Sequence, residues 1–295
     1  MIKQDPHALD EPRAESPTSN RRPIEKSGDW RAHVRPYEGG ACERVISYYG
    51  SKYRLARHYP APQHDTIIEP FAGSAGYALH YPEKSVRLYD LNEKICAVWD
   101  YVIRANPDEI RRLPILAYGE RVNDYATTLP QEARWLIGWW VQTATPEPTQ
   151  SHSPWGAHHL ATDSKRTWTP SRREAVAQTS ERVQHWTITR GSYVDIEDQR
   201  ATWFIDPPYQ CKAGRRYPHS VIDFEHLAEW SRSRSGQVVV CENTNSERWL
   251  PFSEFRAITG ANRPTDERSK TKEAIWYRSD SSESSFDDLP LWSNK

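Results

Sequence analysis

The alternation of short apolar runs with amphipathic helical patterns constrains the fold of this chain more than any other feature. The apolar runs are 66–71, 86–90, 202–205, 237–241 and 273–277. Helical patterns at 51–59, 92–105 and 223–234 flank these runs. Strands that alternate with helices pack as a largely parallel sheet covered on both faces. The sequence therefore predicts an α/β fold with a doubly wound, mostly parallel sheet.

A long insert and two polar ends interrupt this alternation. Residues 131–145 predict one strongly apolar helix, and 146–190 lose clear periodicity, so we expect 106–190 to be a helical or irregular insert. Residues 1–43 hold fifteen charged side chains and five prolines, and 279–295 hold six serines and four acids. Such segments bury too little apolar surface to offset their ordering entropy. We expect one domain over 44–278 between two disordered tails.

Charge and cysteine usage limit the classes of function. With 39 basic and 40 acidic residues the formal net charge is -1, so any site for a polyanion must be local. The longest apolar run, 135–141, is far shorter than the roughly 20 residues of a membrane helix. No cysteine pair has C-x-x-C spacing, and no acid or cysteine stands at ligand spacing beside the histidines of 152–185. We expect a soluble cytoplasmic protein with reduced thiols and neither a metal nor a membrane partner.

Two motifs at the ends of neighbouring strands point to a ligand. The segment E-P-F-A-G-S-A-G, residues 69–76, stands where a strand ends, and Asp90 ends the next strand. Ligands of doubly wound sheets bind beyond the carboxyl ends of strands, and an acid there can accept hydrogen bonds from ribose hydroxyls. The glycines lack G-x-G-x-x-G spacing, which disfavours a nicotinamide-dependent oxidoreductase. A tight turn without ligand, with Asp90 or Asn92 as a helix cap, is the alternative.

The third motif is D-P-P-Y, residues 206–209, directly after an apolar run. Two prolines remove two N–H donors, so the Asp206 carboxylate and the Pro207 carbonyl present acceptors suited to an exocyclic amine. Tyr209 offers a flat face on which a base can stack. A plain strand-ending turn would explain the prolines but neither the acid nor the aromatic ring.

The fourth motif is Y-Y-G-S-K, residues 48–52. Ser51 can cap a following helix, Gly50 permits close approach of another group, and Lys52 can reach a carboxylate. Taken together and in this order, the four motifs resemble the Dam-like, D12 class of N6-adenine DNA methyltransferases. The resemblance spans roughly 45–277.

The resemblance implies a Rossmann-like methyltransferase sheet, S-adenosylmethionine as cofactor and double-stranded DNA as partner, with the insert 106–190 recognising the target. It assigns cofactor contacts to a set of residues from all the motifs: Tyr48, Lys52, Glu69, Phe71, Gly73, Asp90 and Asp206. Asp206, Pro207 and Tyr209 would form the catalytic site. The chain departs from the family pattern at Ala75, where a glycine usually stands, and we expect a helix to begin there with negative φ.

The implied reaction is direct methyl transfer to N6 of a flipped adenine by a protein that we expect to be monomeric in solution. For DNA contact the insert offers six basic residues against three acids over 148–190, interleaved with Trp155, Trp168 and Trp186. A solvated insert without DNA contact is the alternative. The charged segment 263–272 is a second candidate. The residues predicted to contact nucleic acid are Arg166, Arg172, Arg173, Lys270 and Lys272.

Two rival functions remain open on the sequence alone. The acceptor wall of D-P-P-Y suits any exocyclic amine, so a methyltransferase acting on guanine N2 in RNA is one alternative. A DNA-binding module that keeps the fold without turnover is the other.

Overall fold

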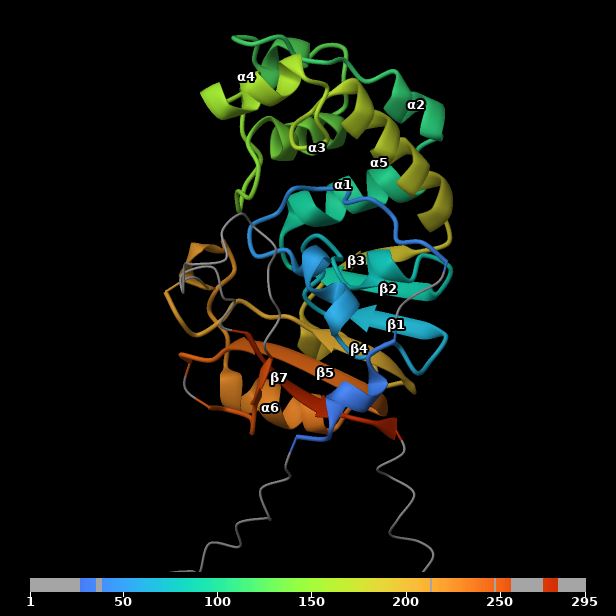
Figure 1. The fold of residues 1–295 in the computed structure, drawn as a ribbon, viewed down its shortest axis with the longest axis vertical. Helices are drawn as coiled ribbons and strands as arrows, with labels where there is room; N and C mark the ends of the chain where they lie inside the picture. Colours follow the sequence, from blue (N-terminus) through green and yellow to red (C-terminus); the bar gives the residue numbers. More distant parts are fainter. Residues whose placement is uncertain (1–26, 36–38, 213, 247, 256–272, 281–295) are drawn as a thin grey trace, which may run out of the picture.

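A computed structural model describes residues 27–35, 39–212, 214–246, 248–255 and 273–280. Its centre is a seven-stranded sheet of order β3-β2-β1-β4-β5-β7-β6 (Figure 1). The strands are β1 (Thr66–Glu69), β2 (Ser85–Asp90), β3 (Thr187–Arg190), β4 (Ala201–Ile205), β5 (Gly236–Asn243), β6 (Ser253–Phe255) and β7 (Glu273–Arg278). The neighbouring strands in the row β3-β2-β1-β4-β5 all pair in parallel, and β7 runs antiparallel to β5 and β6. The predicted mostly parallel α/β sheet is confirmed.

The core lies on both faces of this sheet, which explains why its strands read as continuous apolar runs. Neighbouring residues on one strand point to opposite sides: Ile67 packs into one cluster and Ile68 into the other, as do Phe204 and Trp203. The first face is covered by α1 (Glu93–Arg104) and α3 (Gln131–Val141), and the second by α6 (Phe224–Arg232). The sheet is therefore doubly wound, as the sequence predicts.

The segment between β2 and β3 is mostly helical. After α1 come α2 (Pro107–Arg111), α3, α4 (Pro154–Ala161) and α5 (Pro170–Val183), which gather at the β3 end of the molecule (Figure 1). α5 was not expected, because its buried side chains are mostly small or polar (Arg172, Ala175, Val176, Ala177, Thr179, Ser180 and Val183), and these give little hydrophobic periodicity. The edge strands β3 and β6 were also missed, since each has at most four residues.

Two local expectations were wrong. Residues 51–59 form two short 3-10 turns, Lys52–Arg54 and Ala56–His58, rather than one helix. The described residues between 27 and 43 are not a tail but pack on the sheet. Gly28 N–H donates to Tyr277 O at 2.9 Å, and Trp30, 7% exposed, has its ring centroid 4.9 Å from that of Phe255. A few aromatic contacts thus order a segment whose overall composition is polar.

No helix within the described ranges is long and apolar enough to cross a membrane. Residues 1–26 and 281–295 of the predicted tails lie outside the described residues.

Candidate active site

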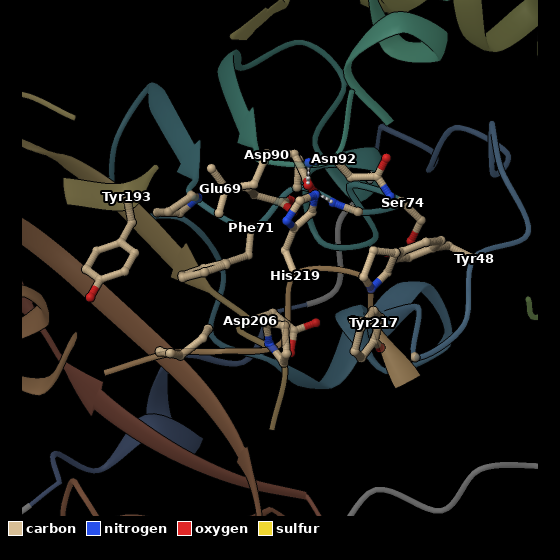
Figure 2. Close-up of a pocket in the computed structure, with 18 of the residues that line it drawn as sticks. Tyr48, Glu69, Phe71, Ser74, Asp90, Asn92, Tyr193, Asp206, Tyr217 and His219 are labelled. Carbon is tan, nitrogen blue, oxygen red and sulfur yellow. Dashed lines mark hydrogen bonds between the residues drawn. The ribbon is translucent and has the colours of Figure 1, made fainter. Parts of the chain in front are cut away.

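A pocket of about 250 Å³ opens where β1, β2 and β4 end. Because these strands are parallel, their carboxyl ends meet at one edge of the sheet and bring three of the sequence motifs together. Asp90 and Phe71 line the pocket together with Asp206, and the segment 48–52 forms a further wall. Figure 2 shows Asp90 above and Asp206 below in the view, with Phe71 and His219 drawn between them.

The end of the pocket beside β1 and β2 is organised by backbone N–H groups. Asp90 Oδ2 accepts a hydrogen bond from Gly73 N at 2.9 Å, and its Oδ1 accepts one from Asn92 N at 2.8 Å (Figure 2). Asn92, not Asp90, is the N-cap of α1, since its side chain accepts from Lys94 N. Burial raises the pKa of Asp90, and these backbone donors oppose the rise. The carboxylate keeps a lone pair beyond these bonds for a ligand donor.

Glu69 lies beneath this end of the pocket, where β1 ends. It is 2% exposed, and its Oε1 accepts a hydrogen bond from Ala78 N at 2.7 Å. Burial raises the pKa of Glu69 to about 8, although the Ala78 N–H opposes the rise. Glu69 is therefore mostly a neutral acid at pH 7 and brings little negative charge to the pocket floor.

The turn after β1 requires unusual backbone conformations. Gly73 has φ +46°, and a Cβ there would meet the Tyr48 ring at 3.1 Å. Ala75 has φ +48°, which corrects the expectation of negative φ at this position. A left-handed conformation is costly for alanine and free for glycine, so the departure from the family pattern stores strain. At Gly76 a Cβ would lie 2.6 Å from Tyr53 N and 3.1 Å from Lys52 N, so the turn fits against the backbone of these two residues only without a side chain.

Segment 48–52 carries one wall of the pocket. The Tyr48 ring lies 5.7 Å from the Tyr217 ring, and the Tyr217 hydroxyl donates to Tyr49 O at 3.0 Å. Gly50 has φ +73°, and a Cβ there would stand 1.9 Å from the Tyr217 hydroxyl. The predicted close approach at Gly50 is thus made by a tyrosine of the loop that follows D-P-P-Y, which the sequence motifs did not indicate.

The opposite end of the pocket is built from buried charges. Lys52 Nζ lies 2.8 Å from Asp206 Oδ1, with 7% and 20% of the two side chains exposed. Beyond this ion pair, Asp206 Oδ1 accepts no hydrogen bond from a described residue. Burial disfavours the Lys52 ammonium, but the charges of Asp206 and Glu273 outweigh that effect and raise the pKa of Lys52. The expectation that Lys52 reaches a carboxylate is confirmed.

Tyr209 lies behind this ion pair. Its hydroxyl donates to Glu273 Oε2 at 2.6 Å, and the Lys52 ammonium lies 4.7 Å from its ring centroid. Burial raises the pKa of Glu273, and the Lys52 charge opposes the rise. Tyr209 is not among the side chains that line the pocket, so stacking of a base on it stays a prediction. Glu273, on β7, was missed because only the sheet brings it beside a motif 64 residues away.

The predicted DNA-contacting residues of the insert do not form one basic surface. Arg172 is 3% exposed, its Nε donates to Lys165 O at 2.8 Å, and its guanidinium lies 4.0 Å from the Trp140 ring centroid. Arg173 Nη1 donates to Leu113 O at 2.5 Å. The assignment of Arg172 to DNA is therefore wrong, since its guanidinium is used inside the insert, and that of Arg173 loses its support. Arg166 is exposed, and Lys270 and Lys272 lie outside the described residues.

The tryptophans of the insert are likewise structural rather than surface residues, with one exception. Trp168 and Trp186 are 0% and 2% exposed, and their indole N–H groups donate to Pro114 O and Pro82 O. Trp155 is 48% exposed on α4. Among the described residues, no group of three or more histidine, cysteine or acidic side chains is arranged to hold a metal ion.

Comparison with known proteins matches the motif-bearing segment to one family. Residues 48–124 match the model of the D12 class N6 adenine-specific DNA methyltransferases. This match confirms the resemblance over Y-Y-G-S-K, the glycine turn at 69–76 and Asp90, and D-P-P-Y lies outside it. No curated protein matches the chain.

Two solved structures show weak overall similarity, both at 11% sequence identity. The glycopeptide N-methyltransferase MtfA matches with a TM-score of 0.29, over 78% of this chain and 75% of its own. A SAM-dependent methyltransferase from Neisseria gonorrhoeae matches with a TM-score of 0.31, over 87% of this chain and 78% of its own.

Proposed function

We infer that this chain, whose residues 48–124 match the model of the D12 class N6 adenine-specific DNA methyltransferases, methylates N6 of adenine in DNA with S-adenosylmethionine. One observation carries the inference. Asp206, the acid of D-P-P-Y, lies outside the matched segment but lines the same pocket as the glycine turn and Asp90. A site for the cofactor and a site for an amine thereby share one cavity.

The β1–β2 end of the pocket fits the adenosyl part of the cofactor. Asp90 can accept from ribose hydroxyls with its remaining lone pairs, and Phe71, whose ring lies 5.6 Å from that of Tyr193, offers an aromatic surface for a base. Because Glu69 is mostly protonated, it can donate a hydrogen bond to a ligand acceptor. The Tyr48 ring closes this end of the pocket by packing against the backbone of Gly73, which has no side chain.

The D-P-P-Y end fits the amine that receives the methyl group. S-adenosylmethionine supplies an electrophilic methyl carbon. The Asp206 carboxylate, which forms no hydrogen bond with a described residue beyond its ion pair with Lys52, and the Pro207 carbonyl can accept the two N6 hydrogens and so localise the nitrogen lone pair. The amine must finally lose one proton, and Asp206 is the acceptor within reach. Lys52 balances the buried charge of Asp206 and fixes its carboxylate.

The test is to measure methyl transfer and cofactor binding separately. Purified protein is incubated with duplex DNA and labelled S-adenosylmethionine, and the digested nucleosides are identified by mass spectrometry. We expect N6-methyladenine, and we expect Asp206→Ala to lower the rate about 10²- to 10³-fold, since it removes a fixed acceptor at the reacting atom. The exposed Asp65→Asn serves as the matched acidic control and should keep the wild-type rate.

The products also separate the rival functions. Methylated guanine in RNA, with no methyladenine in DNA, would reassign the substrate. DNA binding without any S-adenosylmethionine binding in calorimetry would leave a non-catalytic module instead. An Asp206→Ala protein with the wild-type rate would remove Asp206 from the reaction.

A further inference from the structure

The loop that follows D-P-P-Y borders the pocket and carries three positive charges and no negative one. Residues 210–222 contain Lys212, Arg215 and Arg216 and no aspartate or glutamate. All three side chains are exposed. The same loop continues into Tyr217, Pro218, His219, Val221 and Ile222, which line the pocket. The positive charge is therefore carried by the segment that borders the entrance.

The backbone of this loop is held against the site. Gly214 begins the 3-10 turn Gly214–Arg216, and a Cβ on it would lie 1.8 Å from Tyr209 O. The Tyr217 hydroxyl anchors the other end to Tyr49 O. Arg215 and Arg216 are thus placed directly beside D-P-P-Y, because Gly214 has no side chain and the Tyr217 hydroxyl is anchored.

The charges of the loop are not used by other described parts of the protein. Lys212 and Arg215 form neither an ion pair nor a side-chain hydrogen bond with any described residue. The Arg216 guanidinium lies 5.2 Å from the Tyr49 ring centroid, a contact that orients it without neutralising its charge. Unpaired guanidinium and ammonium groups in a row are suited to a chain of phosphates.

The six basic residues of the insert over 148–190, by contrast, mostly contact other residues of the protein. Lys165 pairs with Glu43 at 3.3 Å, and Arg190 pairs with Glu93 at 3.2 Å. Arg182 donates to Gly40 O at 2.9 Å. With Arg172 and Arg173 also engaged, Arg166 is the only one of the six whose side chain contacts no partner among the described residues. Most of the basic side chains of 148–190 are therefore engaged within the insert, whereas those of the loop beside the pocket are not.

We propose that Lys212, Arg215 and Arg216 bind the DNA backbone beside the nucleotide that enters the pocket. This inference rests on the proposed function, because it names the DNA-contacting residues of the same site. Phosphate contacts from a fixed loop would hold the strand on both sides of an extruded base, where pairing with the partner strand no longer does so.

The test compares two variants that each lose three positive charges, at different places on the protein. One is Lys212→Gln, Arg215→Gln and Arg216→Gln, and the control is Arg87→Gln, Arg112→Gln and Arg232→Gln, three exposed arginines outside the pocket lining. Binding of a fluorescent duplex is measured across salt concentrations, and S-adenosylmethionine binding is measured by calorimetry. Each lost phosphate contact should lower affinity about 8-fold at 0.1 M salt and reduce the salt slope by about 0.9.

We expect the loop variant to lose both affinity and slope while binding S-adenosylmethionine like the wild type, and the control to keep both. A loop variant with the wild-type slope, or a control that weakens binding equally, would overturn the proposal while leaving the methyltransferase assignment standing. A wild-type protein that binds S-adenosylmethionine but no DNA duplex would overturn both the DNA substrate and this loop's role.

Discussion

The two ends of the pocket are built by different means. Beside β1 and β2, backbone N–H groups and glycine turns do the positioning: Gly73 and Asn92 donate to Asp90, and Gly76 lets one turn rest on another. Beside β4, side chains from distant segments do it, since Lys52 contacts Asp206 and Glu273 receives the Tyr209 hydroxyl. The first end uses local geometry, and the second uses buried charge.

This difference predicts how each end fails. Local backbone geometry is lost only when a residue cannot adopt its φ or its spacing, and the cost is confined to that turn. A buried charge pair is lost when either partner is removed, because the other is left uncompensated. Variants at the D-P-P-Y end should therefore show coupling between residues that are far apart in sequence, whereas variants at the β1–β2 end should not.

The largest expected effect concerns Glu69, a fully buried acid at the β1–β2 end that forms no ion pair with a described residue. Burial raises its pKa from 4.5 to about 8, so the folded protein keeps a proton that the unfolded chain releases above about pH 4.5. The stability that this proton contributes is complete below pH 4.5 and is lost as pH rises toward 8. Relative to Glu69→Gln, the wild type should lose up to about 4 kcal/mol between pH 5 and 8.

Thermal or denaturant unfolding at pH 5, 6, 7 and 8 measures this difference. The Gln side chain can still accept from Ala78 N, so the variant isolates the charge. Glu225→Gln, an exposed acid on α6, is the control and should leave the pH dependence of the wild type nearly unchanged. A constant difference between Glu69→Gln and wild type across this range would show that Glu69 is ionised in the fold.

Sequence reasoning was successful where the site depends on local pattern. Gly73 and Asp90 were found because each stands where a strand ends, and parallel strands must bring those ends together. It failed where the arrangement is set by tertiary contact. Glu273 lies on an antiparallel strand far along the chain, and Arg172 looks like a surface charge although its guanidinium packs on Trp140.

The next effect in size tests the charge pair of the D-P-P-Y end. Lys52→Met leaves Asp206 and Glu273 without their shared cation, and we expect a loss of about 3 kcal/mol of stability, since breaking a buried pair costs about 3–5 kcal/mol and the Asp206 side chain remains 20% exposed. A double-mutant cycle with Asp206→Asn measures the coupling. The double variant should be markedly more stable than the sum of the single losses predicts.

Additive losses in that cycle, within about 0.5 kcal/mol, would mean that the two side chains do not stabilise each other. The contrast between the two ends of the pocket would then disappear. The pair of Gly73→Ala and Asp206→Asn, taken from opposite ends, is the reference cycle, for which we expect additivity.

The smallest effect tests the strained turn at the β1–β2 end. Ala75 has φ +48°, where an L-residue costs about 1–2 kcal/mol more than glycine. Its methyl group is fully buried, and losing it costs about 0.8 kcal/mol. Glycine also gives the unfolded chain more conformational entropy, which costs about 0.4–1 kcal/mol. These contributions nearly cancel, so Ala75→Gly should change the stability by less than about 0.5 kcal/mol in denaturant unfolding. Ala78→Gly is the matched control, because Ala78 is equally buried but has no left-handed backbone. It loses the same methyl group and gains the same unfolded-chain entropy without relief of strain, and it should destabilise by about 1–2 kcal/mol. Equal destabilisation by both substitutions would show that the turn stores no strain, and that alanine serves this position as well as glycine.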